Sequence, residues 1–144
     1  MVHFVGAGSG AADLITVRGA KLLGEADVVS RTKSKCDQLA ADLAGKTATK
    51  ITTAQVDADK VEEVIALIEK AEAEGKTTVR LHTGDSSIYG AVREQMDALD
   101  ALHIPYESCP GVSACFGAAA SLNVEYTLPG VSQTLIITRM EGRT

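Results

Sequence analysis

Short apolar runs alternate along the chain with longer stretches whose apolar residues recur at a helical period. Val2 to Val5 is such a run, and the glycine-rich string GAGSG ends it. From Lys60 to Glu74 the apolar positions follow the spacing i, i+3, i+4 and i+7, which predicts an amphipathic helix. Asp59 stands where it can cap the start of this helix, and Gly75 stands where it can end it.

The same reasoning divides the whole chain into alternating strands and helices. The further strands that it predicts are 26–29, 49–51, 77–82, 106–109 and 132–139. The further helices that it predicts are 13–25, 36–45, 88–102 and one that follows a loop within 110–122. Strands separated by helices predict an α/β fold, a three-layer domain whose mostly parallel sheet is flanked by helices. The 144 residues fit one domain.

The loops that follow the strands are the expected place for a ligand, because ligands of such sheets bind beyond the carboxyl ends of the strands. Four predicted loops lie at that edge, namely GAGSG, RTKSK, TGDSSIYG and PGVSA. RTKSK holds three cations in five residues. It is either a solvated loop or a contact for an anionic ligand.

Composition narrows the class of protein. The net charge is −5 and the isoelectric point is about 5.1, so the chain lacks the basic character of a nucleic-acid binder. The three cysteines form no CxxC motif, which predicts reduced thiols in a cytoplasmic protein rather than a disulfide framework or a zinc site. No histidine stands at metal-ligand spacing, and no apolar run reaches the length of a membrane span. We therefore expect no metal, no nucleic acid and no membrane as partners.

GAGSG allows a second interpretation, a Rossmann-type nucleotide-binding module. With Ala11 in the last position, the string satisfies the glycine fingerprint of such modules. The acidic residue that should meet the ribose is not in place, because Glu25 and Asp27 do not stand at the end of the second predicted strand. This weak match leaves the nucleotide-binding module as an alternative.

Three longer stretches together resemble one family. VGAGSGAADLITVRGAKLLGEADVV resembles the opening of the tetrapyrrole methylases, the corrin and porphyrin methyltransferases that use S-adenosylmethionine. VRLHTGDSSIYGAVREQM resembles their second signature, and CPGVSACFGAAASLNVEYTLPGVSQTLIITRMEGRT resembles their third region. The family usually has GPGD where this chain has GSGA, and proline where this chain has Ser86.

The resemblance implies a cofactor, S-adenosyl-L-methionine, that lies between two α/β domains and leaves as S-adenosyl-L-homocysteine. Residues 1–144 would form the N-terminal domain, and we expect the C-terminal domain, absent here, to begin just after EGRT. Carried over residue by residue, the cofactor contacts are Ser9, Thr83, Gly84, Asp85, Ile88, Ser113 and Ala114. The resemblance identifies no catalytic acid or base.

The resemblance also implies a precorrin-type tetrapyrrole as substrate, methylated on a ring carbon in cobalamin biosynthesis. Such a substrate is a polycarboxylate, so cations are candidates for binding it. The candidates are Arg31, Lys33, Lys35, Arg139 and Arg143. A homodimer is implied for the full-length form. A non-catalytic or truncated half-domain is the other alternative.

Overall fold

The computed structural model describes residues 1–31, 36–45, 48–52 and 61–139. The strands are β1 (Val2–Gly6), β2 (Val28–Arg31), β3 (Thr49–Thr52), β4 (Thr78–His82) and β5 (Tyr106–Cys109). The helices are α1 (Val17–Glu25), α2 (Asp37–Leu43), α3 (Val61–Ala73), α4 (Arg93–Ala101) and α5 (Ala114–Leu122), with a short 3-10 turn at Ala12–Leu14. No helix in the described part of the chain has the length and apolar character needed to cross a membrane.

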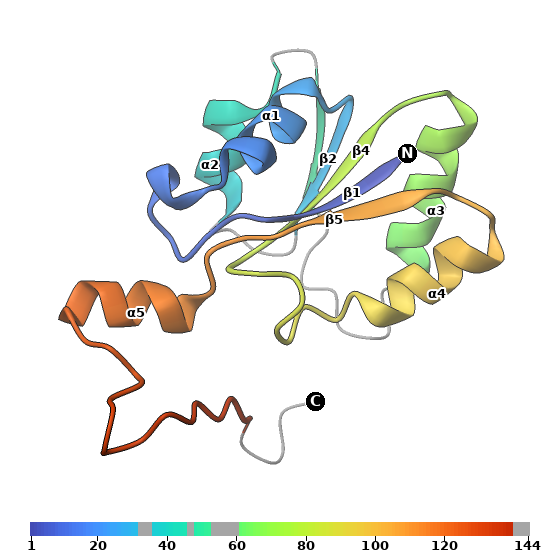
Figure 1. Ribbon diagram of the computed structural model, residues 1–144. Helices are drawn as coiled ribbons and strands as arrows, with labels where there is room; N and C mark the ends of the chain where they lie inside the picture. The colour runs from blue at the N-terminus through green and yellow to red at the C-terminus, as the bar shows by residue number, and fades with distance from the viewer. Residues whose placement is uncertain (32–35, 46–47, 53–60, 140–144) are drawn as a thin grey trace.

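The strands form one sheet in the order β3-β2-β4-β1-β5, and every neighbouring pair is parallel. Helices α1 and α2 cover one face of this sheet, and α3 and α4 cover the other (Figure 1). This arrangement confirms the predicted three-layer α/β fold. Because β1 lies between β4 and β5, the loops that follow these three strands leave the sheet side by side.

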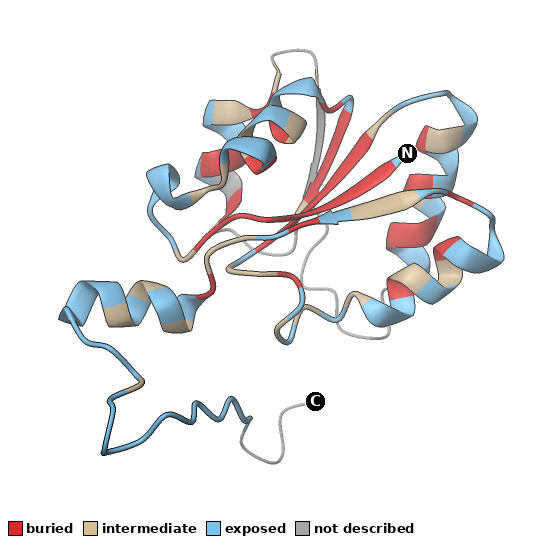
Figure 2. Ribbon diagram, viewed as in Figure 1, coloured by how far each residue is buried: buried red, intermediate tan, exposed pale blue. Residues whose placement is uncertain are grey.

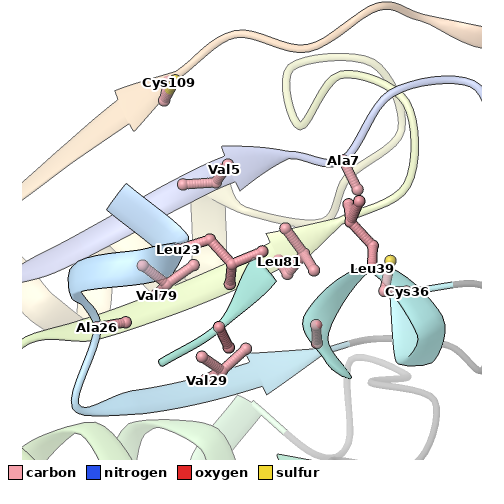
Figure 3. Packing of buried hydrophobic residues seen from close by; sticks show 12 residues of the cluster. Val5, Ala7, Leu23, Ala26, Val29, Cys36, Leu39, Val79, Leu81 and Cys109 are labelled. Atoms are coloured by element: carbon pink, nitrogen blue, oxygen red, sulfur yellow. The ribbon is translucent and has the colours of Figure 1, made fainter. Parts of the chain in front are cut away.

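Buried side chains fill both faces of the sheet, as a parallel sheet between two helical layers requires. Residues of β1 alternate between the faces, so that Val5 belongs to one cluster and Phe4 to the other. Figure 3 shows the first cluster, to which Leu23 of α1 and Leu39 of α2 both belong. In this view Leu23 lies near Val79 of β4, and Leu39 lies near Ala7. Strands β1, β2 and β4 are the most continuously buried part of the described chain, whereas the edge strand β5 is only partly buried (Figure 2).

Local chemistry sets where the helices begin and end. The Thr16 hydroxyl accepts a hydrogen bond of 3.0 Å from the Gly19 N–H and caps α1, so this helix begins later than the predicted 13–25. Gly75, with φ of +69°, ends α3 as predicted, and the following N–H of Lys76 donates to Ala71 in the manner of a Schellman motif. The predicted cap Asp59 lies outside the described residues.

Residues 114–139 form an arm that leaves the body of the domain (Figure 1). Helix α5 has no buried residue, and residues 128–139 are exposed. The prediction of a strand over 132–139 is wrong for this structure, since the only pairing described there is the isolated bridge between Leu128 and Ser132. A β-favouring sequence forms a strand only where a neighbouring strand takes its backbone hydrogen bonds.

Candidate functional site

The loops that follow β1 and β4 are joined by their backbones. The Gly8 N–H donates to the Gly84 carbonyl at 3.2 Å, and the Gly84 N–H donates to the Gly8 carbonyl at 2.8 Å. The Ala7 N–H donates to the His82 carbonyl at 2.7 Å. The GAGSG and HTGD strings therefore form one continuous surface at the carboxyl edge of the sheet.

The loop after β5 packs against this surface with no room for side chains. A Cβ atom on Gly6 would lie 2.6 Å from the Gly84 carbonyl oxygen and from the Gly111 Cα. A Cβ atom on Gly111 would lie 2.7 Å from the Gly6 Cα and still closer to the Gly84 carbonyl oxygen. Real Cβ atoms do not approach so closely, so glycine is required at positions 6 and 111 for the three backbones to meet. We call Gly6, Gly84 and Gly111 the glycine contact.

Asp85 ties the second loop to the third. Its Oδ2 accepts a hydrogen bond of 2.8 Å from the Gly111 N–H. Its Oδ1 accepts one of 2.8 Å from the Ser87 N–H and a second from the Ser87 hydroxyl. Both carboxylate oxygens are thus engaged by the protein itself, which makes Asp85 a residue that positions the loops. Its predicted contact with the cofactor stays a prediction.

The charge of Asp85 follows from the same contacts. Burial on its own raises the pKa of this carboxyl, but the hydrogen bonds from the Ser87 hydroxyl and from the Gly111 and Ser87 N–H groups outweigh burial. The pKa of Asp85 consequently lies below its ordinary value. The loops are held together by a carboxylate that stays ionised throughout the neutral range.

Ser9 and Ser113 connect the site to α5. A Cβ atom on Gly117, in the first turns of α5, would lie 2.6 Å from the Ser9 Cβ, so the Ser9 side chain rests directly on this helix. Ser113 occupies the N-cap position of α5 and is buried, and its hydroxyl accepts from the Cys115 thiol at 3.5 Å. A Cβ atom on Gly84 would lie 3.6 Å from the Ala114 nitrogen.

The structure therefore brings the predicted cofactor residues together at one edge. Thr83 and Ala114 are exposed there, and Ser9 and Gly84 are half-buried. Ile88, also half-buried, lies in the turn after Asp85, and its N–H donates to the Asp85 carbonyl at 3.4 Å. Nowhere among the described residues do three or more histidine, cysteine or carboxylate side chains gather as a metal site requires.

The predicted cations are only partly described. Arg31 ends β2 and is half-buried. The Arg139 guanidinium lies over the Tyr89 ring, with its Cζ 5.7 Å from the ring centroid. Lys33, Lys35 and Arg143 lie outside the described residues. The loop after β4 is thus in contact with one of the five candidate cations.

Sequence reasoning missed a buried polar network beneath the loop after β4. The fully buried Arg80 donates from Nε to the Gln95 Oε1 at 3.1 Å and from a terminal nitrogen to the Ser30 hydroxyl at 3.0 Å. Gln95 in turn donates to the Ala91 carbonyl at 2.7 Å. Burial lowers the pKa of Arg80 to about 10, so the guanidinium is still charged at neutral pH. Arginine within a β-like run gives no signal of burial, because arginine is mostly exposed in folded proteins.

The neighbour of this network on β4 is a neutral histidine. Burial, followed by the charge of Arg80, lowers the pKa of His82 to about 3. His82 lies 6.1 Å from the Phe4 ring, measured between ring centroids.

A hollow of about 330 Å³ lies on this side of the site, lined by residues 85–87, Val92, Met96, Ser108 and Pro110. Its size is at the lower end of small-molecule sites.

Comparison with known proteins agrees with this geometry. The family model described as Tetrapyrrole (Corrin/Porphyrin) Methylases matches residues 1–144. The chain is 49% identical to a cobalt-precorrin-4 C(11)-methyltransferase of Methanocaldococcus jannaschii, covering 99% of this chain and 54% of that protein. It is 44% identical to a precorrin-4 C(11)-methyltransferase of Pseudomonas aeruginosa, covering 99% of this chain and 56% of that protein. The chain spans about half the length of the curated relatives it matches.

Solved structures give the same result. The X-ray structure of a cobalt precorrin-4 methyltransferase matches with a TM-score of 0.91 and 42% identity, over 99% of this chain and 58% of that chain. A uroporphyrin-III C-methyltransferase from Thermus thermophilus, complexed with S-adenosyl homocysteine, matches with a TM-score of 0.73 and 28% identity, over 92% of this chain and 52% of that chain. On the evidence of sequence, fold and site together, the chain belongs to the tetrapyrrole (corrin/porphyrin) methylases.

Proposed function

We propose that the chain is the cofactor-binding half of an S-adenosylmethionine-dependent C-methyltransferase that acts at C-11 of precorrin-4 or cobalt-precorrin-4 in cobalamin biosynthesis. The observation that carries the proposal is the convergence of three loops at the glycine contact, held there by Asp85. The relatives named above support the reaction and the substrate, and the complex with S-adenosyl homocysteine supports the cofactor.

The residues at this edge fit such a cofactor. Gly10 has φ of +130°, and a Cβ atom there would meet nothing within 4 Å, so this stretch of backbone is open. Thr83 and Ala114 are exposed at the same edge of the sheet and offer a hydroxyl and a small apolar surface. We propose that the residues that bind the cofactor are Ser9, Thr83, Gly84, Asp85, Ile88, Ser113 and Ala114. When bound, S-adenosylmethionine supplies a methyl group that its sulfonium has already activated.

The chain's own contribution to the reaction is orientation. A rigid surface built from glycine backbones and a buried N-cap serine holds a ligand in one position, and correct orientation lowers a barrier by about 7–11 kcal/mol in favourable cases. We assign no general acid or base. Substrate carboxylates would meet the cations Arg31 and Arg139, together with Lys33, Lys35 and Arg143 from outside the described residues.

Two further properties belong to the proposal. We propose a cytoplasmic location, supported by the three cysteines, none of which is in a disulfide. We also propose a homodimer for the full-length form, without nucleic acid as a partner. The net charge of −5 supports the last point.

Calorimetric titration of the 144-residue chain with S-adenosylhomocysteine, with NAD as the control ligand, tests the proposed function. We expect binding of S-adenosylhomocysteine alone. Binding of NAD alone would favour the Rossmann-type nucleotide-binding module instead. If neither binds, the same titration on this chain fused to the second half of the M. jannaschii relative decides between a half-site that needs its partner and a non-catalytic domain.

A further inference from the structure

We propose that Tyr89 and Arg139 form a carboxylate-binding pair at the candidate site, in which the Tyr89 ring holds the Arg139 guanidinium in position for a carboxylate of a tetrapyrrole. The substrate class rests on the proposed function, whereas the pair rests on the geometry of this chain. In this pair Arg139 is the binding residue and Tyr89 is a positioning residue.

Tyr89 lies in a turn whose backbone angles are unusual and are held in place by surrounding contacts. Its φ is +54° and that of Ala91 is +49°, although neither residue is glycine. Between them, a Cβ atom on Gly90 would lie 2.9 Å from the Ser86 carbonyl carbon, so the turn is tightly closed. The Gln95 side-chain amide donates a hydrogen bond of 2.7 Å to the Ala91 carbonyl and accepts one from Arg80, which fixes this end of the turn. Strained backbone that the surroundings hold in place is typical of ligand-binding positions.

The turn directs a large aromatic side chain outward instead of into the core. Tyr89 is 57% exposed, yet it directly follows Ile88 in the loop that carries Thr83, Gly84 and Asp85. A plain connection between a strand and a helix needs no such residue at such a backbone angle. The exposed ring therefore belongs to the same loop as the proposed cofactor residues.

Arg139 differs from the other arginines whose ion pairs the structure describes. Arg18 lies 3.0 Å from the Glu107 carboxylate, and Arg93 pairs with Asp97 four residues later. In the part of the chain that the structure describes, no carboxylate lies within ion-pair distance of Arg139. An aromatic ring holds this guanidinium in place of an acid, so its positive charge is not neutralised by a described acidic partner.

The chemistry of such a pair favours a planar acid-bearing ligand. A guanidinium stacked on a ring keeps its N–H groups at its edge, where they can donate in pairs to one carboxylate. Stacking also reduces the freedom of a long side chain before the ligand arrives, which lowers the entropic cost of binding. Lysine cannot reproduce either property, because its ammonium is not planar.

Titration of the chain with uroporphyrin III, a tetrapyrrole that carries acetate and propionate groups, tests the pair by absorbance. We expect Arg139→Ala to weaken binding about tenfold, as the loss of one charge-assisted contact does, and Arg139→Lys to recover only part of the loss. Tyr89→Leu should weaken binding about three- to fivefold, and Tyr89→Phe should leave it unchanged. Tyr89→Leu combined with Arg139→Ala should bind no more weakly than Arg139→Ala alone.

Matched controls separate the pair from general effects. Lys70→Ala removes one exposed positive charge from the last turn of α3 and should leave the affinity unchanged. Circular dichroism checks that every variant folds, and the affinity for S-adenosylhomocysteine should stay constant across the series.

Each outcome has one meaning. Three outcomes would overturn the pair. The losses of uroporphyrin affinity could add up in the double variant, or Lys70→Ala could lose as much affinity as Arg139→Ala. The third is that the unaltered chain does not bind uroporphyrin at all. If S-adenosylhomocysteine still binds in those cases, the proposed function stands without the pair. If uroporphyrin binds with the expected coupling, and S-adenosylhomocysteine binds neither this chain nor its fusion to the second half of the M. jannaschii relative, the pair stands and the cofactor assignment fails.

Discussion

At the scale of single residues, one carboxylate organises the site. Asp85 receives hydrogen bonds from its own loop and from Gly111 in the third loop. Each such bond from an N–H to a charged acceptor contributes more than an ordinary one, and an unsatisfied partner is costly. Asp85, which its motif assigns to the ligand, is therefore also the residue that holds the loops of the binding surface together.

Asp85→Asn should lower the free energy of unfolding by about 1–3 kcal/mol at pH 7, because an amide cannot satisfy all three donors. Folding lowers the pKa of Asp85, so its stabilisation is present above the ordinary value of 3.8 and is lost as the pH falls through the folded-state value. Urea unfolding at pH 7 and pH 3 checks this, with the exposed Asp97→Asn as control. If Asp85→Asn lowered the free energy of unfolding more at pH 3 than at pH 7, the stabilising role assigned to the ionised Asp85 would be contradicted.

Gly111→Ala should destabilise the domain by about 1–3 kcal/mol, since its Cβ atom would overlap the backbones of Gly6 and Gly84. Thermal unfolding measures the effect. Gly24→Ala in helix α1 is the matched control, because its Cβ atom would lie an ordinary 3.5 Å from the Leu43 carbonyl oxygen of α2. Alanine at that helical position should be neutral or stabilising by about 0.5–1 kcal/mol. If the two substitutions changed the stability equally, the close packing at the glycine contact would not be what stabilises the domain.

At the scale of elements, the sequence predicted the body of the domain well and its outer parts poorly. Strands β1 and β4 differ from the predicted bounds by one residue, because runs buried on both faces are clear in a sequence. The partly buried edge strand β5 also has the predicted bounds. The helix predicted at 88–102 begins only at Arg93, since the positive φ angles of Tyr89 and Ala91 cannot continue a helix. The predicted strand at 132–139 failed because pairing depends on a neighbour, which no local pattern reveals.

The candidate site was predictable in part, for a related reason. Motifs placed Ser9, Thr83, Gly84 and Ser113 in loops, and parallel pairing then brought those loops together. The partners of Asp85, the buried Arg80 network and the stacking of Arg139 on Tyr89 depend on side-chain positions across distant segments. Spacing along a chain does not contain that information.

Gly117→Ala should weaken binding of S-adenosylhomocysteine with little change in overall stability. Its new Cβ atom would press on the Ser9 side chain and displace α5 from the first loop, while alanine favours the helix itself. Calorimetry measures the affinity. Ala118→Gly, on an exposed position of the same helix, changes helix propensity without this contact and serves as control. Unchanged affinity in Gly117→Ala would show that the position of α5 does not matter for the ligand.

At the scale of the whole molecule, the chain has two unlike parts. The body buries its apolar residues in two clusters, whereas the arm at 114–139 exposes many of its own (Figure 2). The large apolar side chains exposed on the arm include Phe116, Leu122, Val124, Val131, Leu135, Ile136 and Ile137. A concentration of large exposed apolar side chains in one segment commonly marks an interface.

The 144-residue chain by itself should therefore self-associate in a concentration-dependent way through the arm. Val131 and Ile136 are 80% and 78% exposed, so replacing both with serine should reduce association without destabilising the body. Val17, which is 89% exposed on α1, gives the control substitution Val17→Ser. Sedimentation velocity over a range of concentrations measures the effect. Equal association of both variants would exclude the arm as the contact.

The position of β1 between β4 and β5 has a consequence for synthesis on the ribosome. Of the five described strands β1 emerges before the others, and both of its neighbours are made much later. Gly6 therefore meets Gly111, and Asp85 meets the N–H that fixes it, only after the loop beyond β5 has left the exit tunnel. Every strand of the sheet is complete before the ligand surface exists, so a nascent chain cannot hold its cofactor around an unfinished domain.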